Sequence, residues 1–280
     1  MSPTWQAKPD MAMETVSFAG WLRVILRGTV GGAVLIAGLA LLLLLRLIEG
    51  PLFGLRRPWT PTITVVVCRL LLVIIGIRRR VVGVPMVGLG ALVANHSSWL
   101  DILVLNSRNR VYFVAKSEVA GWPAIGWLAR ATGTVFIRRR GRDAQLHRDV
   151  ISQRLQAGHR LLIFPEGTST DGLVVLPFKS TLFEAFFTAN AQGNLCVQPV
   201  TVTYQSPGLE APEYYGWWGG MDLGPHLLKV LSAPRQGEVS LVYHAPLQVV
   251  DFADRKALAL ACEKSVRSGL PPSQAPLPVL

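Results

Sequence analysis

The feature that most constrains this chain is an uninterrupted apolar segment near its N-terminus. Residues 29–45 form a stretch of 17 without a charge, and it ends in five successive leucines. With a few residues added on either side, it reaches the ~20 that a helix needs to cross a bilayer. The alternative is a helix buried in a protein core. Only 16% of the residues are charged, against about 25% in ordinary soluble domains, so we expect an intracellular domain attached to a membrane.

A second apolar segment, residues 62–77, is shorter and contains Arg69. Because a charge in the middle of a bilayer is costly, we expect an interfacial or re-entrant helix whose Arg69 reaches the lipid headgroups. A linker rich in Pro, Gly and Arg, residues 50–61, joins the two segments, and three arginines, residues 78–80, close the second. Arginines occur before, between and after the segments, so the positive-inside rule fixes no orientation.

The net charge of +11 is concentrated toward the N-terminus. Residues 1–80 carry 10 Lys or Arg and 3 Asp or Glu, which gives +7. Basic residues that flank apolar segments favour an anionic membrane surface. Nucleic-acid binding is the other common interpretation of such a charge, but here the arginines alternate with membrane-like segments rather than with stacking aromatic residues. We therefore expect a lipid bilayer, and no nucleic acid, as a partner.

Short β-type segments alternate with helical ones from about residue 85 onward. This alternation predicts an α/β fold with a mixed, mainly parallel sheet flanked by helices, preceded by an N-terminal membrane-associated helical segment. The expected strands are residues 91–94, 111–115, 134–137, 160–164, 196–204 and 239–244, and the expected helices are 98–107, 123–131, 142–156, 179–190 and 252–267. We expect three parts: a tail with membrane-anchoring helices (1–80), a catalytic domain (81–270) and a Pro-rich tail (271–280).

His96 and Asp101 are the first candidate catalytic residues. Four residues separate them, at the junction of an expected strand and helix. A carboxylate bonded to one imidazole nitrogen fixes the tautomer and leaves the other nitrogen as a general base. The alternative is a structural role, with His96 at a strand end and Asp101 favouring the helix dipole. Ser97 or Ser98 could cap the helix, and Ser97 is a conceivable nucleophile, although the chain has no G-x-S-x-G motif.

The second candidate is a polar loop that follows the expected strand at residues 160–164. It reads Phe-Pro-Glu-Gly-Thr-Ser-Thr-Asp-Gly over residues 164–172. In an open α/β sheet, ligands bind in the crevice beyond the carboxyl ends of the strands, where backbone N–H groups and hydroxyls hold anionic oxygens. An ordinary turn is the alternative.

Taken together, these motifs resemble those of the glycerolipid acyltransferases of the lysophosphatidate acyltransferase family. Four blocks occur in the family's order over roughly residues 85–210. They are His96 with Asp101, Gly-Thr-Val-Phe-Ile-Arg-Arg at 133–139, Phe-Pro-Glu-Gly-Thr at 164–168 and Val-Gln-Pro-Val at 197–200, with a K-x-E segment at 116–118. The resemblance implies a membrane-associated enzyme on the cytoplasmic side of the bacterial inner membrane. Such an enzyme transfers a fatty acyl group from acyl-CoA or acyl-carrier protein to the free hydroxyl of a lysolipid.

The resemblance also implies residue roles. His96 would be the general base and Asp101 the residue that orients it. Glu166, Gly167 and Thr168 would help to hold the acceptor headgroup. Arg138, Arg139 and Lys116 would supply positive charge for a phosphate. We expect no bound cofactor and no metal, because the three cysteines (Cys68, Cys196 and Cys262) are far apart in the sequence and form no metal-binding pattern.

One position departs from the family pattern. Many members have Arg after Glu-Gly-Thr, whereas this chain has Ser169, and a hydroxyl cannot replace a charged bidentate contact. Lysophosphatidate is the first expectation for the acceptor, with phosphatidic acid as the product. Lyso-ornithine lipid is the alternative, because the aromatic segment at residues 214–226 is similar to the related acyltransferases that complete ornithine lipids. An interfacial aromatic belt explains that segment equally well.

Two further classes of protein remain open at the level of sequence. A membrane serine hydrolase would use Ser97 or Ser98 as its nucleophile. A non-enzymatic membrane-binding module would need neither His96 nor Asp101. The sequence leaves open the acyl donor, the preferred chain length, the number of membrane spans and the oligomeric state.

Overall fold

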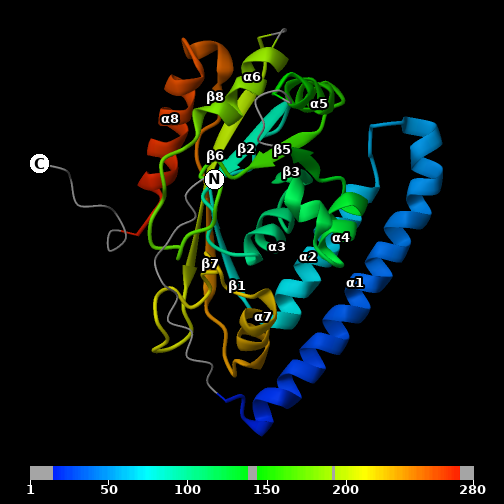
Figure 1. Cartoon of the computed structure of the whole chain (residues 1–280), viewed down its shortest axis with the longest axis vertical. Helices are drawn as coiled ribbons and strands as arrows, with labels where there is room; N and C mark the ends of the chain where they lie inside the picture. Colours follow the sequence, from blue (N-terminus) through cyan, green and yellow to red (C-terminus); the bar gives the residue numbers. More distant parts are fainter. Residues whose placement is uncertain (1–14, 138–143, 191–192, 272–280) are drawn as a thin grey trace, which may run out of the picture.

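A computed structural model describes residues 15–137, 144–190 and 193–271. These residues form one mixed sheet with helices on both faces, and two apolar helices run along one side of the molecule (Figure 1). The α/β prediction is therefore confirmed.

The observed elements follow the predicted order closely. The strands are β1 (Arg78–Val82), β2 (Gly90–Ala94), β3 (Val111–Lys116), β4 (Val135–Ile137), β5 (Arg160–Ile163), β6 (Cys196–Gln205), β7 (Glu238–Tyr243) and β8 (Leu247–Gln248). The α-helices are α1 (Phe18–Phe53), α2 (Thr60–Ile75), α3 (Leu100–Asn106), α4 (Ile125–Thr132), α5 (Ala144–Gln156), α6 (Glu184–Ala189), α7 (Leu223–Ser232) and α8 (Arg255–Ser268). Short 3₁₀ helices occur at Ser117–Gly121, Ser180–Phe183 and Val249–Asp251, so the helix expected over 179–190 is a 3₁₀ turn followed by α6.

The strand order in the described part of the sheet is β1-β7-β6-β2-β5-β3-β4, and β8 pairs with β6. The neighbouring pairs are parallel except for β6–β7 and β6–β8, which are antiparallel. In the parallel centre, Val93 lies opposite Ile163 on one side and Pro199 on the other. The carboxyl ends of β2 and β5 therefore meet at one edge of the sheet, which is where ligands bind in such folds.

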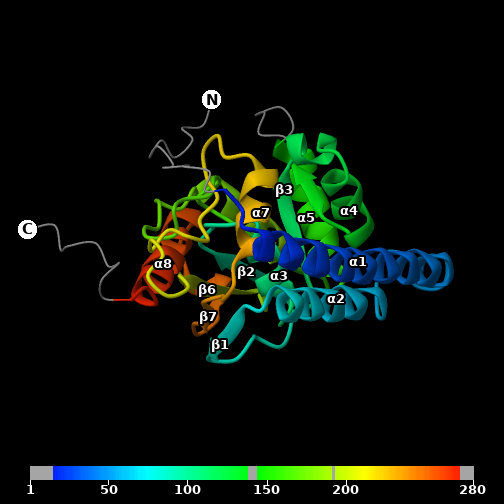
Figure 2. The same ribbon diagram turned by 90° about the horizontal axis from the view of Figure 1, so that it is seen from below.

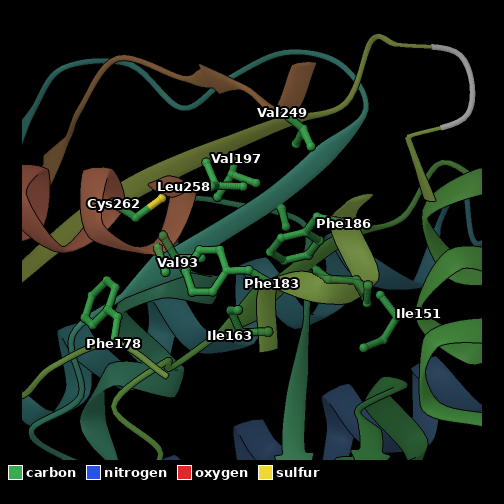
Figure 3. Close-up of a cluster of buried hydrophobic side chains, with 14 of the residues drawn as sticks. Val93, Ile151, Ile163, Phe178, Phe183, Phe186, Val197, Val249, Leu258 and Cys262 are labelled. Carbon is green, nitrogen blue, oxygen red and sulfur yellow. The ribbon is translucent and has the colours of Figure 1, made fainter. Parts of the chain in front are cut away.

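The central strands are buried on both faces, as parallel strands covered by helices must be. Side chains of Val93, Ile163 and Val197 face α5, α6 and α8, where Phe183 and Phe186 fill the core (Figure 3). The alternate residues, such as Leu92 and Leu162, face α2, α3 and α7 in a second core cluster. This alternation is the two-residue period of a strand.

Helix α1 is much longer than the apolar segment, residues 29–45, from which it was predicted. It has 36 residues, and the mean hydropathy of its most apolar stretch is 2.4, which is enough to cross a membrane by length and composition. It begins at the Ser17 cap, whose hydroxyl accepts from the Gly20 N–H at 3.1 Å, and ends at Gly54 with φ of +58°. Most of its surface is exposed, and α2 packs beside it (Figure 2).

Both N-terminal helices are bonded to the catalytic domain. Near the start of α1, Arg23 donates to the Ser232 carbonyl at 2.7 Å, and Arg27 donates to the Ala233 carbonyl at 2.7 Å, at the end of α7. In α2, Arg69 donates through Nε to the Ser107 carbonyl at 2.7 Å. The structure thus gives Arg69 a protein partner where the sequence suggested lipid headgroups, because α2 packs on α3.

The boundary expected between residues 80 and 81 falls inside β1. This strand pairs in parallel with β7, from Arg78 opposite Glu238 to Val82 opposite Val242. The arginines at 78–80 therefore form an edge strand as well as following an apolar helix. Charged edge strands resist pairing with other chains. Neither β1 nor α7 was predicted from the sequence.

Candidate active site

The loop between β2 and α3 brings His96 and Asp101 together. Asp101 is fully buried, and its Oδ2 lies 2.7 Å from Nδ1 of His96. The same oxygen accepts from the backbone N–H groups of Ser97 at 2.9 Å and Ser98 at 3.0 Å. The carboxylate thus holds the loop and the imidazole at once, and it leaves Nε2 of His96 for a substrate.

Two residues to which the sequence gave no role complete this arrangement: the half-buried Tyr204 and the buried Asn95. Tyr204, at the end of β6, donates its hydroxyl to Asp101 Oδ1 at 2.7 Å. Burial, followed by the charge of Asp101, raises the pKa of Tyr204, so it stays a donor. Asn95 forms two hydrogen bonds with the backbone of Val202, each of 2.8 Å, and so fixes the end of β2 to β6. No sequence signal separates Tyr204 from other strand aromatics.

The imidazole is also fixed by stacking and by its backbone. The ring of His96 lies parallel to that of Phe164 with centroids 4.1 Å apart. The His96 carbonyl accepts from the Thr170 N–H at 2.9 Å, and the Ser97 carbonyl accepts from the Trp217 N–H at 2.7 Å. The loop at residues 164–172 and the aromatic segment therefore both clamp the catalytic loop.

Glu166 has a different place from the one expected. It is 1% exposed, its Oε1 accepts from the His96 N–H at 2.7 Å, and its Oε2 accepts from the Leu176 N–H at 2.7 Å. Burial raises the pKa of this carboxyl to about 8, although both N–H donors oppose the rise. In the structure Glu166 therefore fixes the catalytic loop, and it is not among the residues that line the cavity beside His96. Its role toward the acceptor headgroup stays a prediction from the resemblance.

The serine hydrolase interpretation fails on geometry. Ser97 is fully buried, and its hydroxyl has no hydrogen-bond partner among the described residues, His96 included. The Ser98 hydroxyl accepts from the Leu100 N–H at 3.3 Å, which is a local helix-start contact. Neither hydroxyl is activated by the base, as a protein nucleophile requires.

A cavity of about 460 Å³ extends from His96 between the helices. Most of its lining is apolar, and helices α1 to α4 contribute part of it, with Leu39, Val67 and Leu103 among these residues. Four of the expected substrate-binding residues also line it: Lys116, Gly167, Thr168 and Ser169. Arg138 and Arg139 lie outside the described residues. An apolar cavity with a few polar groups beside a base suits a lipid substrate.

The aromatic segment belongs to the protein interior rather than to a membrane belt. Tyr214, Tyr215 and Trp218 are buried. Trp99, next to the catalytic loop, donates its indole N–H to Nδ1 of His226 at 2.9 Å. Burial, followed by Lys229, lowers the pKa of His226 to about 4, so this histidine stays neutral and accepts that bond. Within the described ranges, no group of three His, Cys, Asp or Glu residues comes together as a metal site.

Comparisons with known proteins identify the family to which this chain belongs. An acyltransferase family model matches residues 85–203. A lyso-ornithine lipid O-acyltransferase from Rhodobacter capsulatus is 54% identical over 268 residues, which are 96% of this chain and 97% of that protein. The chain belongs to the acyltransferase family. This acyltransferase is therefore a lysolipid-acylating enzyme associated with a membrane.

Two further comparisons, with one relative and one solved structure, cover different shares of this acyltransferase. A 1-acyl-sn-glycerol-3-phosphate acyltransferase from Neisseria meningitidis serogroup B is 40% identical over 105 residues, 37% of this chain and 41% of that protein. The crystal structure of the 1-acyl-sn-glycerophosphate (LPA) acyltransferase PlsC from Thermotoga maritima covers 87% of this chain and 95% of its own, with a TM-score of 0.56 at 19% identity. The latter likeness shows a shared fold.

Proposed function

We propose that this acyltransferase transfers a fatty acyl group from an acyl thioester to the free hydroxyl of lyso-ornithine lipid. The observation that carries this proposal is the 54% identity to a lyso-ornithine lipid O-acyltransferase along nearly the whole of both chains. Ser169 supports it, because an amino-acid headgroup does not require the phosphate-binding arginine that this position lacks. Lysophosphatidate is the second candidate, supported by the 40% identity to the Neisseria relatives over 105 residues.

In the proposed mechanism, His96 removes the proton from the acceptor hydroxyl through Nε2 while Asp101 holds Nδ1. The hydroxyl oxygen attacks the thioester carbonyl carbon and forms a tetrahedral intermediate. The carbon–sulfur bond then breaks, and the leaving thiolate takes the proton from the imidazolium, so the base is regenerated. A positioned general base contributes about 10²- to 10⁴-fold to the rate. The donor is acyl-CoA or acyl-carrier protein, and the mechanism requires no cofactor or metal.

We assign the apolar cavity to the acyl chains and its polar end to the headgroup. The leucines and valines of α1 to α3 in its lining suit methylene groups. Lys116, Gly167, Thr168 and Ser169 line the same cavity as His96, so a headgroup there would lie near the reacting hydroxyl. The Lys116 ammonium would attract the carboxylate of an ornithine headgroup. Arg138 and Arg139 stay proposals from the sequence.

We further propose that α1 lies in the membrane interface rather than across the bilayer. Its first turns are bonded to α7 through Arg23 and Arg27, and Arg57, just after its end, donates to the Ala131 carbonyl at 3.4 Å. A helix whose two ends contact one water-soluble domain cannot carry one end to the far side. We place this domain on the cytoplasmic side of the bacterial inner membrane, where the donors are.

The test of function offers the full-length enzyme both lysolipids, each with labelled acyl-CoA and acyl-carrier protein. Ornithine lipid is the expected main product. Formation of phosphatidic acid alone would overturn the choice of acceptor, and the absence of both products would overturn the function. His96→Ala should lower turnover by about 10²- to 10⁴-fold without altering the melting temperature. Retention of more than half of the activity would remove His96 as the base.

A second variant tests the acceptor at the headgroup. Ser169→Arg adds a cation to the cavity wall beside Gly167 and Thr168. Acylation of lyso-ornithine lipid should fall, because the new guanidinium repels the ornithine ammonium, whereas acylation of lysophosphatidate should hold or rise. Equal, small effects on both acceptors would show that residue 169 does not contact the headgroup.

A further inference from the structure

Two arginines contact the same tyrosine ring and the same glycine at the edge of the sheet away from the active site. Arg57 and Arg154 both lie over the Tyr112 ring, with Cζ 5.8 and 4.8 Å from its centroid. Both also adjoin Gly133. Arg154 donates through Nη2 to the Gly133 carbonyl at 2.6 Å, and a Cβ at Gly133 would lie 2.7 Å from Nη1 of Arg57. The charge of Arg57 disfavours the charged form of Arg154, and such repulsion raises the free energy of the folded protein unless an anion compensates it.

The surrounding groups leave this cluster positive. The carboxylate nearby is Glu49, which already accepts from Arg46 at 3.1 Å and from Thr60 at 2.6 Å. Burial, followed by the charge of Arg57, lowers the pKa of Arg154 to about 10. Its buried Nε–H has no partner in the described part of the chain. The carbonyl end of α4 offsets only part of the charge of two arginines.

The cluster is distinct from the active site by topology. Tyr112 lies at the amino end of β3, opposite Leu161, the second residue of β5. His96 and Glu166 follow the carboxyl ends of β2 and β5. The two arginines are therefore at the opposite edge of the sheet from the reacting groups, and they do not serve the acceptor headgroup.

Exposed apolar side chains lie near Arg57, in the turn between α1 and α2. Leu52 is 65% exposed, and Phe53 and Trp59 are about 40% exposed and pack edge to face with centroids 5.2 Å apart. These residues form the turn between α1 and α2, which projects beyond the sheet (Figure 1). We call residues 52–59 the hairpin tip. Aromatic and aliphatic side chains beside cations are the composition of segments that lie at an anionic membrane surface.

We propose that the hairpin tip is a docking site for anionic phospholipids, in which Arg57 and Arg154 bind the headgroup phosphate while Leu52, Phe53 and Trp59 enter the lipid. This proposal rests on the interfacial position of α1 proposed above. A phosphate between two guanidinium groups forms charge-assisted hydrogen bonds, and it would relieve their mutual repulsion.

The experiment measures binding of the full-length enzyme to phosphatidylcholine vesicles with and without phosphatidylglycerol. Arg57→Gln should weaken binding to the anionic vesicles about fivefold, the contribution of one cation near such a surface, and leave binding to neutral vesicles unchanged. Arg148→Gln is the matched control, because Arg148 is on α5 like Arg154 but bonds to Gln145. Arg57→Lys keeps the charge and should retain part of the binding, which guards against an effect of misfolding.

Four results would overturn the proposal. They are unchanged binding of Arg57→Gln to anionic vesicles, equal losses on neutral and anionic vesicles, an equal loss in Arg148→Gln, and binding of soluble glycerol phosphate at this cluster with no preference for vesicles. Acyl transfer in detergent micelles is measured separately. An enzyme inactive there would contradict the proposed function, whereas unchanged vesicle binding by Arg57→Gln would contradict only the docking site.

Discussion

Single side chains at this site divide into those that meet the substrate and those that hold the loop. Asp101 accepts from the imidazole, from two backbone N–H groups and from the Tyr204 hydroxyl. Glu166 accepts from two further backbone N–H groups, one of them that of His96. Two buried carboxyl groups thus fix one short loop, so the position of the base depends on side chains other than its own.

Tyr204→Phe tests this dependence. The variant removes the hydroxyl that donates to Asp101 but keeps the ring, and a hydrogen bond to a charged group contributes about 1.5–3 kcal/mol. We expect turnover to fall about tenfold or more, with little change in the Michaelis constants. Tyr243→Phe is the control, because this buried hydroxyl accepts from Asn109 away from the site. Equal loss of activity in both variants would assign the effect to packing.

Glu166 makes stability depend on pH in a defined direction. Its pKa is raised to about 8 from an ordinary value of 4.5, so between these values the folded chain holds a proton that the unfolded chain has released. Stability therefore falls as pH rises through this window. Glu166→Gln should flatten the decline in melting temperature between pH 5 and pH 9, a range set by that pKa. Glu210 is exposed, so Glu210→Gln should leave this decline in melting temperature unchanged. Parallel curves for the wild type and Glu166→Gln would refute this account.

Among the elements, α1 and α2 depend on close approach at a glycine. A Cβ on Gly38 would lie 2.3 Å from Cγ2 of Val67 on α2, whereas a Cβ on Gly32 would meet nothing within 4 Å. Helix pairs in lipid use such small residues to bring their backbones together.

Gly38→Ala should therefore separate α1 from α2, while Gly32→Ala should be neutral or stabilising. Overpacking costs about 1–3 kcal/mol, and replacing a helical glycine by alanine otherwise gains about 0.5–1 kcal/mol. Melting temperatures in one detergent would measure the difference. Equal melting temperatures for the two alanine variants would show that Gly38 is not needed for the packing of α1 on α2.

For the whole molecule, the N-terminal helices form part of the core. Leu72 and Ile75 of α2 and Ile77 are buried in the same cluster as Leu100 and Leu105 of α3. The sequence placed these helices in a separate part, residues 1–80, ahead of the catalytic domain at 81–270. The packing indicates instead that the catalytic domain needs α2.

A chain that begins at residue 78 keeps β1 but lacks both helices. We expect this chain to unfold without cooperativity, at a lower temperature, and to be cleaved readily by protease. The reason is that α3 would expose its apolar face, and burial of each large side chain contributes about 1.5–3 kcal/mol. Circular dichroism melting and limited proteolysis measure this against the full chain. A truncated chain that unfolds cooperatively at the same temperature would show that the helices only anchor the enzyme.

The sequence by itself determined the alternation of strands and helices, the apolar helices and the pairing of His96 with Asp101, because each is a pattern between near neighbours in the chain. Only the tertiary structure decided that Glu166 faces inward, that Tyr204 supports Asp101 and that Arg27 bonds to α7. These contacts join residues 70, 103 and more than 200 positions apart. No local periodicity encodes them, since they arise when parallel strands bring their carboxyl ends to one edge and the helices pack against the same sheet.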